Sequence, residues 1–188
     1  KPEIRALSAS QLTLVMGLSV AQGMEALTGR KAGIKWPNDV VFSGKKICGI
    51  LTEMRVQEGK PEYIVIGAGI NVNQTEFPPE LQDKAASVFL ETGKKADRTL
   101  GIARVMECFE KNYRKFLRTE DLSLLKEDYE SLLLNKDRQV RIIEKKGQWQ
   151  GIARGINDQG ELLVEDSYGN LKEILSGEVS VRGVYSYV

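Results

Sequence analysis

KWPND at residues 35–39 is the first of three stretches that decide the fold of this chain; KKICGIL at 45–51 and GAGIN at 67–71 follow it. Together they bring lysines, a carboxylate, asparagine amides and several glycines to predicted strand and loop positions. These groups suit the binding of an anionic ligand against the backbone, with a lysine ammonium as a compact cation. The chain has no histidine, which excludes acid–base catalysis through imidazole.

Strand patterns surround these stretches. Short apolar segments at residues 34–36, 40–42 and 47–56 predict strands, and the turn Ser43-Gly44 predicts a hairpin between the last two. The Ile-Val-Ile core of residues 63–67 predicts a further strand that is buried.

Helices are predicted before and after the strands. Apolar residues at helical spacing predict a helix over residues 8–28, with Gly29 at the place of a left-handed C-terminal cap. A second amphipathic helix is predicted over residues 99–118. A shorter helix begins at the capping residue Asp121 and runs to about residue 134.

The pattern of apolar segments and turns changes at residues 135–138. From Gln139 onward, short apolar segments alternate with turns, which predicts a small β-barrel of roughly fifty residues. The chain is therefore divided into residues 1–136 and 137–188. The predicted fold class is α+β: a mixed β-sheet packed with helices, followed by the small barrel.

Composition limits the classes of function. The 188 residues, with 41% hydrophobic and 28% charged residues, suit one sizeable core plus a small module. A net charge of +1 gives no global attraction to nucleic acid or to anionic membranes, so anion recognition must be local. Cys48 and Cys108 lack a CxxC or zinc-type partner, which favours reduced thiols in a cytoplasmic protein.

The sequence predicts neither a membrane-spanning segment nor secretion. No apolar run is long enough to span a bilayer, and the start resembles no signal peptide. The absence of an initiating methionine predicts that the chain begins inside a longer natural sequence.

Each candidate residue has a structural alternative. Residues 67–69 first suggest a dinucleotide fingerprint, but Val72 occupies the third glycine position. The glycines either let a ligand approach the backbone or form a bulge or bend. Asn71 and Asn73 either present amides to a purine or cap a turn, and for a lone asparagine the turn is favoured.

The polar residues of the first two stretches are similarly ambiguous. Asn38 and Asp39 either initiate a turn or, for the carboxylate, hold Mg²⁺ or accept a proton. Lys46 taken alone is a solvated edge lysine. If Ile47 faces the core, strand alternation places Lys46 and Cys48 together on the opposite face.

The order KWPND, GKKICGIL and GAGINVN resembles the catalytic core of biotin protein ligases (biotin–[acetyl-CoA carboxylase] ligases), particularly bacterial ones. QLTLVMGLSVAQGME at residues 11–25 and GEVSVRG at 177–183 extend the resemblance over essentially the whole chain. The resemblance implies a catalytic core like that of class II aminoacyl-tRNA synthetases, followed by an SH3-like C-terminal barrel.

The resemblance also implies an activity. Family members use ATP to make biotinyl-5′-AMP and then pass biotin to a lysine of a biotin carboxyl carrier protein. Biotin, ATP and Mg²⁺ are the implied ligands, and a homodimer in the cytoplasm is the implied state. DNA is a partner only if a helix-turn-helix lies upstream, and no membrane is involved.

By motif match, Lys46 is the catalytic cation between the biotin carboxylate and the α-phosphate, and it contacts both. The implied biotin pocket is lined by Gly49, Gly67 and Gly69. The implied nucleotide-side residues are Asn38, Asp39, Asn71 and Arg182. Asp39 is also a catalytic candidate, either as the residue that positions Mg²⁺ or as the acceptor of the proton from the carrier lysine; no protein metal site is implied.

The chain departs from the family pattern at its start. The Gly-Arg-Gly-Arg-type loop and the Ser/Thr-rich biotin contacts of the family precede the matched region, which predicts a C-terminal portion of a ligase that is incomplete alone. The alternatives are a non-catalytic, biotinyl-AMP-responsive dimerising regulator and a lipoate-type ligase. The order of KWPND and GAGIN argues against the latter.

Overall fold

The computed structural model describes residues 4–144, 147–176 and 180–183, with only the backbone described at 180, 182 and 183. The first part contains, in order, η1 (Ala6–Gln11), α1 (Leu12–Thr28), β1 (Gly33–Lys35), β2 (Asp39–Phe42), β3 (Lys45–Gln57), β4 (Lys60–Ile70), η2 (Pro79–Leu81), α2 (Val88–Thr92), α3 (Arg98–Thr119) and α4 (Lys126–Glu130). The second part contains β5 (Gln139–Glu144), β6 (Gly147–Ile156), β7 (Leu162–Glu165), β8 (Leu171–Ile174) and β9 (Ser180–Gly183).

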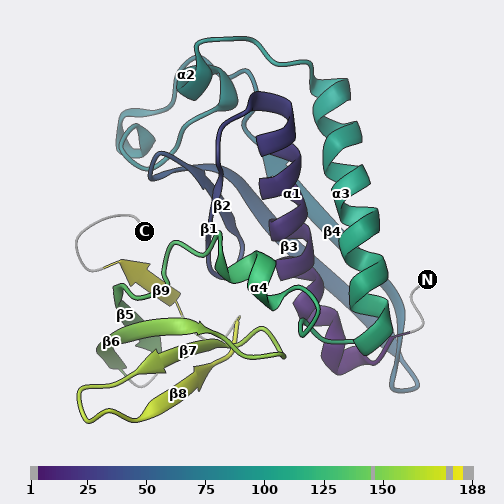
Figure 1. Ribbon diagram of the computed structural model, residues 1–188, viewed down its shortest axis with the longest axis vertical. Coiled ribbons are helices and arrows are strands. Elements are labelled where there is room, and N and C mark those ends of the chain that lie inside the picture. The colour runs from purple at the N-terminus through teal and green to yellow at the C-terminus, as the bar shows by residue number, and fades with distance from the viewer. Residues whose placement is uncertain (1–3, 145–146, 177–179, 184–188) are drawn as a thin grey trace.

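The first sheet has the strand order β1-β2-β3-β4 with antiparallel pairing throughout. Helices α1 and α3 lie side by side in front of it in Figure 1. The predicted first helix is confirmed from Leu12 to Thr28, whereas residues 8–11 lie in the 3-10 helix η1. Gly29 ends α1 with φ 70°, and its N–H donates to the Glu25 carbonyl. One face of the sheet is therefore covered, and the other is available for a site.

Helix α3 packs on α1 through small and polar residues. The Asn112 amide donates to Ser19 Oγ (3.0 Å) and Gln22 Oε1 (2.9 Å), and a Cβ on Gly23 would lie 2.8 Å from Val105. The predicted helix is confirmed, with its N-terminus capped by the Asp97 carboxylate. No described helix is long and apolar enough to cross a membrane.

The prediction that residues 63–67 form a buried strand is wrong. These residues lie in β4, where Tyr63 and Val65 are exposed and Ile64 and Ile66 are only half-buried. Side chains do alternate between the two faces of β4. Ile64 and Ile66 point to the face that packs against the core, whereas nothing in the described part of the chain packs on the face of Val65.

A β-bulge in β3 changes which residues share a face. Val40 pairs with Cys48 while Val41 pairs with Lys46, so Ile47 is the extra residue. The alternation expected for Lys46 and Cys48 is consequently wrong: Cys48 is buried in the core, whereas Lys46 lies on the open face with Asp39.

The second sheet has the order β8-β7-β6-β5-β9, again antiparallel. Its core consists of fully buried aliphatic side chains: Val140, Ile142, Ala153, Ile156, Leu162 and Val164. It lies beside α4 in Figure 1, and its architecture is consistent with a small SH3-like fold.

The third predicted helix is shorter than expected, since α4 covers only Lys126–Glu130.

Candidate functional site

The open face of the first sheet brings together the motif residues of β2, β3 and β4. Gly49 pairs directly with Asp39 on one side and with Gly69 on the other, and Gly67 pairs with Leu51. We call Gly49, Gly67 and Gly69 the glycine platform. Asp39, Gly49 and Gly69, which come from three different strands, thus become neighbours across the sheet.

Lys46 lies over this platform at its β2 end. Its Nζ is 2.5 Å from Asp39 Oδ1, with the lysine side chain 36% exposed and the aspartate 13% exposed. A Cβ on Gly49 would lie 2.8 Å from Lys46 Nζ and 2.9 Å from its Cε. Gly49 is therefore the residue that lets the lysine side chain cross the strand and meet the carboxylate.

The rest of the platform is open. A Cβ on Gly67 or Gly69 would meet only one backbone carbonyl oxygen, at 3.8 Å, and both glycines are exposed. Leu51 beside them is 64% exposed. The surface is an open, partly apolar strip with a cation at one end, which suits a ligand with an apolar body and an anionic end.

The asparagines of the motifs are bonded to backbone groups. Asn38 Nδ2 donates to the Ile50 carbonyl (3.0 Å), and Asn71 Nδ2 donates to the Ala86 carbonyl (3.2 Å). The Asn71 N–H also donates to the carbonyl of Ile47 at the bulge (2.7 Å). Both residues therefore fix loops around the platform in this structure, and their predicted contacts with a nucleotide stay predictions.

Asn73 is used structurally. Its side chain donates to the Ala96 carbonyl (2.9 Å) and accepts from the Ala96 N–H (3.0 Å). Of the two alternatives for this residue, these bonds favour the structural one.

Cys48 lies directly beneath the site but is unsuited to nucleophilic chemistry. Burial raises the pKa of its thiol to about 12, although the nearby Lys46 ammonium lowers it and Asp39 raises it. Because the thiolate is the reactive form, Cys48 acts here as a small apolar core residue.

Arg182 has its backbone in β9, opposite Arg141. Its side chain is outside the described part of the structure, so its predicted contact with phosphate stays a prediction.

Sequence reasoning missed a pair of contacts that anchor KWPND from behind. The Trp36 N–H donates to Asn135 Oδ1 (2.8 Å), and the indole Nε1 donates to the Gly160 carbonyl (3.0 Å). All three residues are buried. The only available signal was a tryptophan in a polar turn, since the partners lie 99 and 124 residues away.

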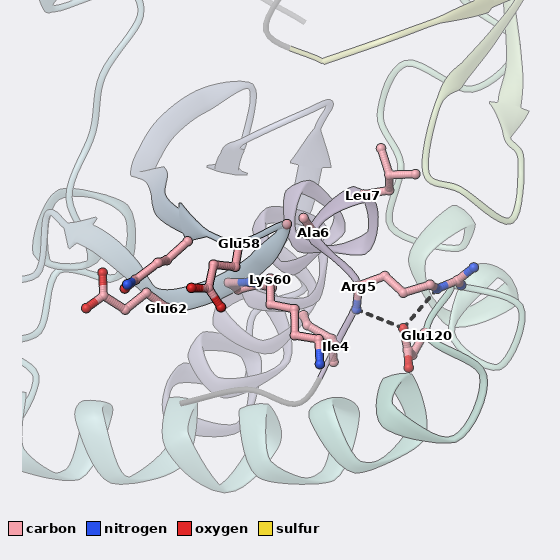
Figure 2. A pocket seen from close by; sticks show the side chains of 11 residues that line it. Ile4, Arg5, Ala6, Leu7, Glu58, Lys60, Glu62 and Glu120 are labelled. Atoms are coloured by element: carbon pink, nitrogen blue, oxygen red, sulfur yellow. Dashed lines mark hydrogen bonds and ion pairs between the residues drawn. The ribbon is translucent and has the colours of Figure 1, made fainter.

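An open groove of about 1230 Å³ lies elsewhere, between the N-terminal segment and the tip of the β3–β4 hairpin. Residues 4–7, 57–62 and Glu120 line it. The Arg5 backbone N–H and guanidinium each donate to Glu120 Oε2 (3.0 Å each), and these bonds are the dashed lines in Figure 2. It contains none of the predicted site residues. Among the described residues, no three acidic, cysteine or histidine side chains are grouped for metal binding.

Two family profiles match the chain. Residues 1–71 match the Biotin/lipoate A/B protein ligase family, and residues 137–182 match the Biotin protein ligase C terminal domain.

Individual proteins match over nearly all of the chain. The bifunctional ligase/repressor BirA of Bacillus spizizenii is 40% identical over 183 residues, which are 96% of this chain and 56% of that protein. The apo structure of the biotin protein ligase from Aquifex aeolicus is 37% identical, with a TM-score of 0.82 over 93% of this chain and 75% of that one. The same ligase in complex with biotin and ATP gives 37% identity and 0.81, over 93% and 72%. The chain thus spans little more than half the length of the curated relative.

Proposed function

Because this chain belongs to the biotin protein ligase family, we propose that it forms much of the catalytic domain and the C-terminal domain of such an enzyme. The whole protein would activate biotin with ATP and transfer it to a lysine of a biotin carboxyl carrier protein. We place the domain boundary between residues 136 and 137, which is supported by the start of the second profile match and by the two separate sheets.

The observation that carries the proposal is the Lys46–Asp39 pair above the glycine platform. In the first reaction a biotin carboxylate oxygen attacks the α-phosphorus of ATP, and pyrophosphate leaves. Both reactants are anionic, so an ammonium between them reduces their repulsion and stabilises charge that develops on the phosphate. Lys46 is held for this role by Asp39.

The platform and the loops suit the two ends of the adenylate. Biotin lies along Gly49, Gly67 and Gly69, where a side chain would obstruct its ring. The nucleotide lies on the side of Asn38, Asp39 and Asn71, and Arg182 is the proposed phosphate ligand. In the second reaction the amine of the carrier lysine attacks the acyl carbon and AMP leaves.

Asp39 has two candidate roles in this scheme besides holding Lys46. It is the carboxylate nearest to Lys46, and Mg²⁺ is commonly held by one or two carboxylates together with substrate phosphates. It therefore fits a Mg²⁺ ion carried mainly by ATP. As a proton acceptor for the carrier lysine it would first have to leave the Lys46 ammonium.

The test is ATP-dependent transfer of biotin to a carrier domain by the full-length protein. Lys46→Ala should lose about 3–4 kcal/mol of transition-state stabilisation, the range for removal of an electrostatic stabiliser. The matched control is Lys45→Ala, one residue away. Lys45 Nζ donates a hydrogen bond to the Gln82 carbonyl (2.8 Å) on the surface, away from Asp39. Equal transfer by the two variants would refute the assignment.

Two alternatives are separable by experiment. The first profile match includes lipoate ligases, so competition between biotin and lipoate for adenylation tests the substrate. The relative named ligase/repressor favours a regulatory role of the whole protein. A mobility-shift assay of the full-length protein on its own promoter DNA, with and without biotin and ATP, tests that role.

We also propose that the whole protein is a cytoplasmic homodimer. The exposed apolar side chains of the β3–β4 hairpin away from the glycine platform, such as Val56 and Val65, support an interface. The free thiols of Cys48 and Cys108 support a reducing compartment. Sizing with and without biotin plus ATP tests the dimer; an unchanged monomer mass would contradict it.

A further inference from the structure

Trp36 joins the site to the second sheet. It follows β1 directly, and because Lys35 pairs with Asp39, residues 36–38 form a short turn that ends at the site carboxylate. The position of Trp36 therefore determines where this turn lies and where Asp39 begins β2.

Two hydrogen bonds fix Trp36 from the side opposite the site. The backbone N–H donates to Asn135 Oδ1 in the segment between the two sheets, and the indole N–H donates to the Gly160 carbonyl in the β6–β7 turn. Both bonds are buried, where an unpaired polar group is costly. The turn and the second sheet are thus held as one unit.

The turn that carries Gly160 is itself rigid and closely packed. Asn157 Oδ1 accepts the N–H groups of Gln159 (3.1 Å) and Glu161 (2.9 Å). Gly160 has φ +80°, and a Cβ there would lie 2.9 Å from Leu122 and 3.0 Å from Leu14. The glycine allows its carbonyl to come close to the first domain.

We propose that Trp36 is a positioning residue: its indole N–H couples the second sheet to the 36–38 turn and so holds Asp39, and through it Lys46, in the geometry required for adenylation. This inference rests on the proposed function. Among the described residues, no hydrogen bond or ion pair joins Trp36 to the glycine platform or to Lys46, so Trp36 acts through the turn. The expected signature is a loss of turnover with biotin binding retained.

The test is Trp36→Phe in the full-length protein, assayed by biotin-dependent release of pyrophosphate from ATP. Phenylalanine keeps an aromatic ring and removes the N–H. We expect kcat per active site to fall about ten- to a hundredfold, the loss that follows a shift of up to an ångström in a reacting group, with KM for biotin unchanged within about twofold.

The matched control is Trp149→Phe. Trp149 is the other tryptophan of the chain, and its indole also donates one hydrogen bond, to Glu144 at 3.0 Å, in the second sheet. This variant should keep the wild-type kcat and KM. Active sites are counted from the stoichiometry of biotin binding, which the inference expects to be retained, so that partial unfolding does not pass for a slower reaction.

The outcomes are distinct. If the wild-type protein shows no biotin-dependent release of pyrophosphate, the proposed function itself is refuted. An active wild type with Trp36→Phe equal to Trp149→Phe in kcat per site refutes the inference, as does a variant in which only KM for biotin rises. If Trp36→Phe does not fold, the second variant carries benzothienylalanine at position 36 in the Trp149→Phe background. This side chain keeps the bicyclic shape of tryptophan but lacks the N–H. The same two outcomes for kcat per site and KM for biotin decide the test.

Discussion

Replacement of Gly49 by alanine places a methyl group where the Lys46 side chain now lies. The new Cβ would be 2.8 Å from Lys46 Nζ, whereas ordinary contacts begin at 3.4 Å, so the ammonium must retreat by about 0.6 Å. Because Nζ is only 2.5 Å from Asp39 Oδ1, the retreat breaks or distorts the ion pair. The substitution therefore moves the proposed catalytic cation without removing it.

The cost should appear in the rate and not in stability. The displaced atoms are the far end of a flexible side chain, and Gly49 has no left-handed backbone, so the free energy of unfolding should change by less than about 1 kcal/mol. A misplacement approaching an ångström costs up to about a hundredfold in rate. We expect kcat for adenylation to fall about ten- to a hundredfold, or about 1.4–2.7 kcal/mol in the barrier.

The assay is biotin-dependent pyrophosphate release, with Gly67→Ala as the comparison. A Cβ on Gly67 meets only the Leu51 carbonyl oxygen, at 3.8 Å, and otherwise enters the open space over the platform. It should raise KM for biotin about tenfold and leave kcat nearly intact. A Gly49→Ala enzyme with wild-type kcat, or one that differs from Gly67→Ala in no parameter, would refute the reasoning.

Two further predictions concern the contact between α4 and β6 and the burial of the two cysteines. Glu130→Ala removes the acceptor of the Ile156 N–H (3.0 Å) and should lower the free energy of unfolding by about 1–3 kcal/mol in a urea titration. The exposed Glu127→Ala on the same helix should change it by less than about 0.5 kcal/mol, and equal values would contradict the contact. At pH 8 a thiol with a pKa of about 12 is ionised to about one part in ten thousand, so iodoacetamide should modify Cys108 and spare Cys48 in the folded protein. Peptide mass spectrometry checks this, and equal rates would refute the burial of Cys48.

Features that depend on neighbouring residues were predictable. The helix that ends at Gly29 and the hairpin turn at Ser43-Gly44 are present, and both residues of that turn have the positive φ that such turns require. Periodicity and turn chemistry act within a few residues, so one sequence carries them. The start of the second sheet at β5 (Gln139–Glu144) was predictable for the same reason, since the spacing of turns changes there.

Features that depend on distant residues were not predictable. The exposure of Val65 reflects what covers the sheet, and strand composition does not encode that. Asn73 was ambiguous because its partner, Ala96, lies 23 residues away, and the bond between Trp36 and Gly160 spans 124 residues. A polar side chain alone does not reveal whether its partner is a ligand or a remote backbone group.

The bulge at Ile47 explains why the spacing of Lys46 and Gly49 suits the proposed chemistry. In a regular strand, residues three apart point to opposite faces, so the lysine would be separated from the glycine platform by the sheet. One extra residue reverses the alternation, because Val40 and Val41 pair with Cys48 and Lys46, and Lys46 then crosses Gly49 to reach Asp39. The bond from the Asn71 N–H to the Ile47 carbonyl stabilises this irregularity with the end of the GAGIN stretch. The three motifs therefore form one structural unit, in which the third fixes the bulge that orients the lysine of the second toward the carboxylate of the first.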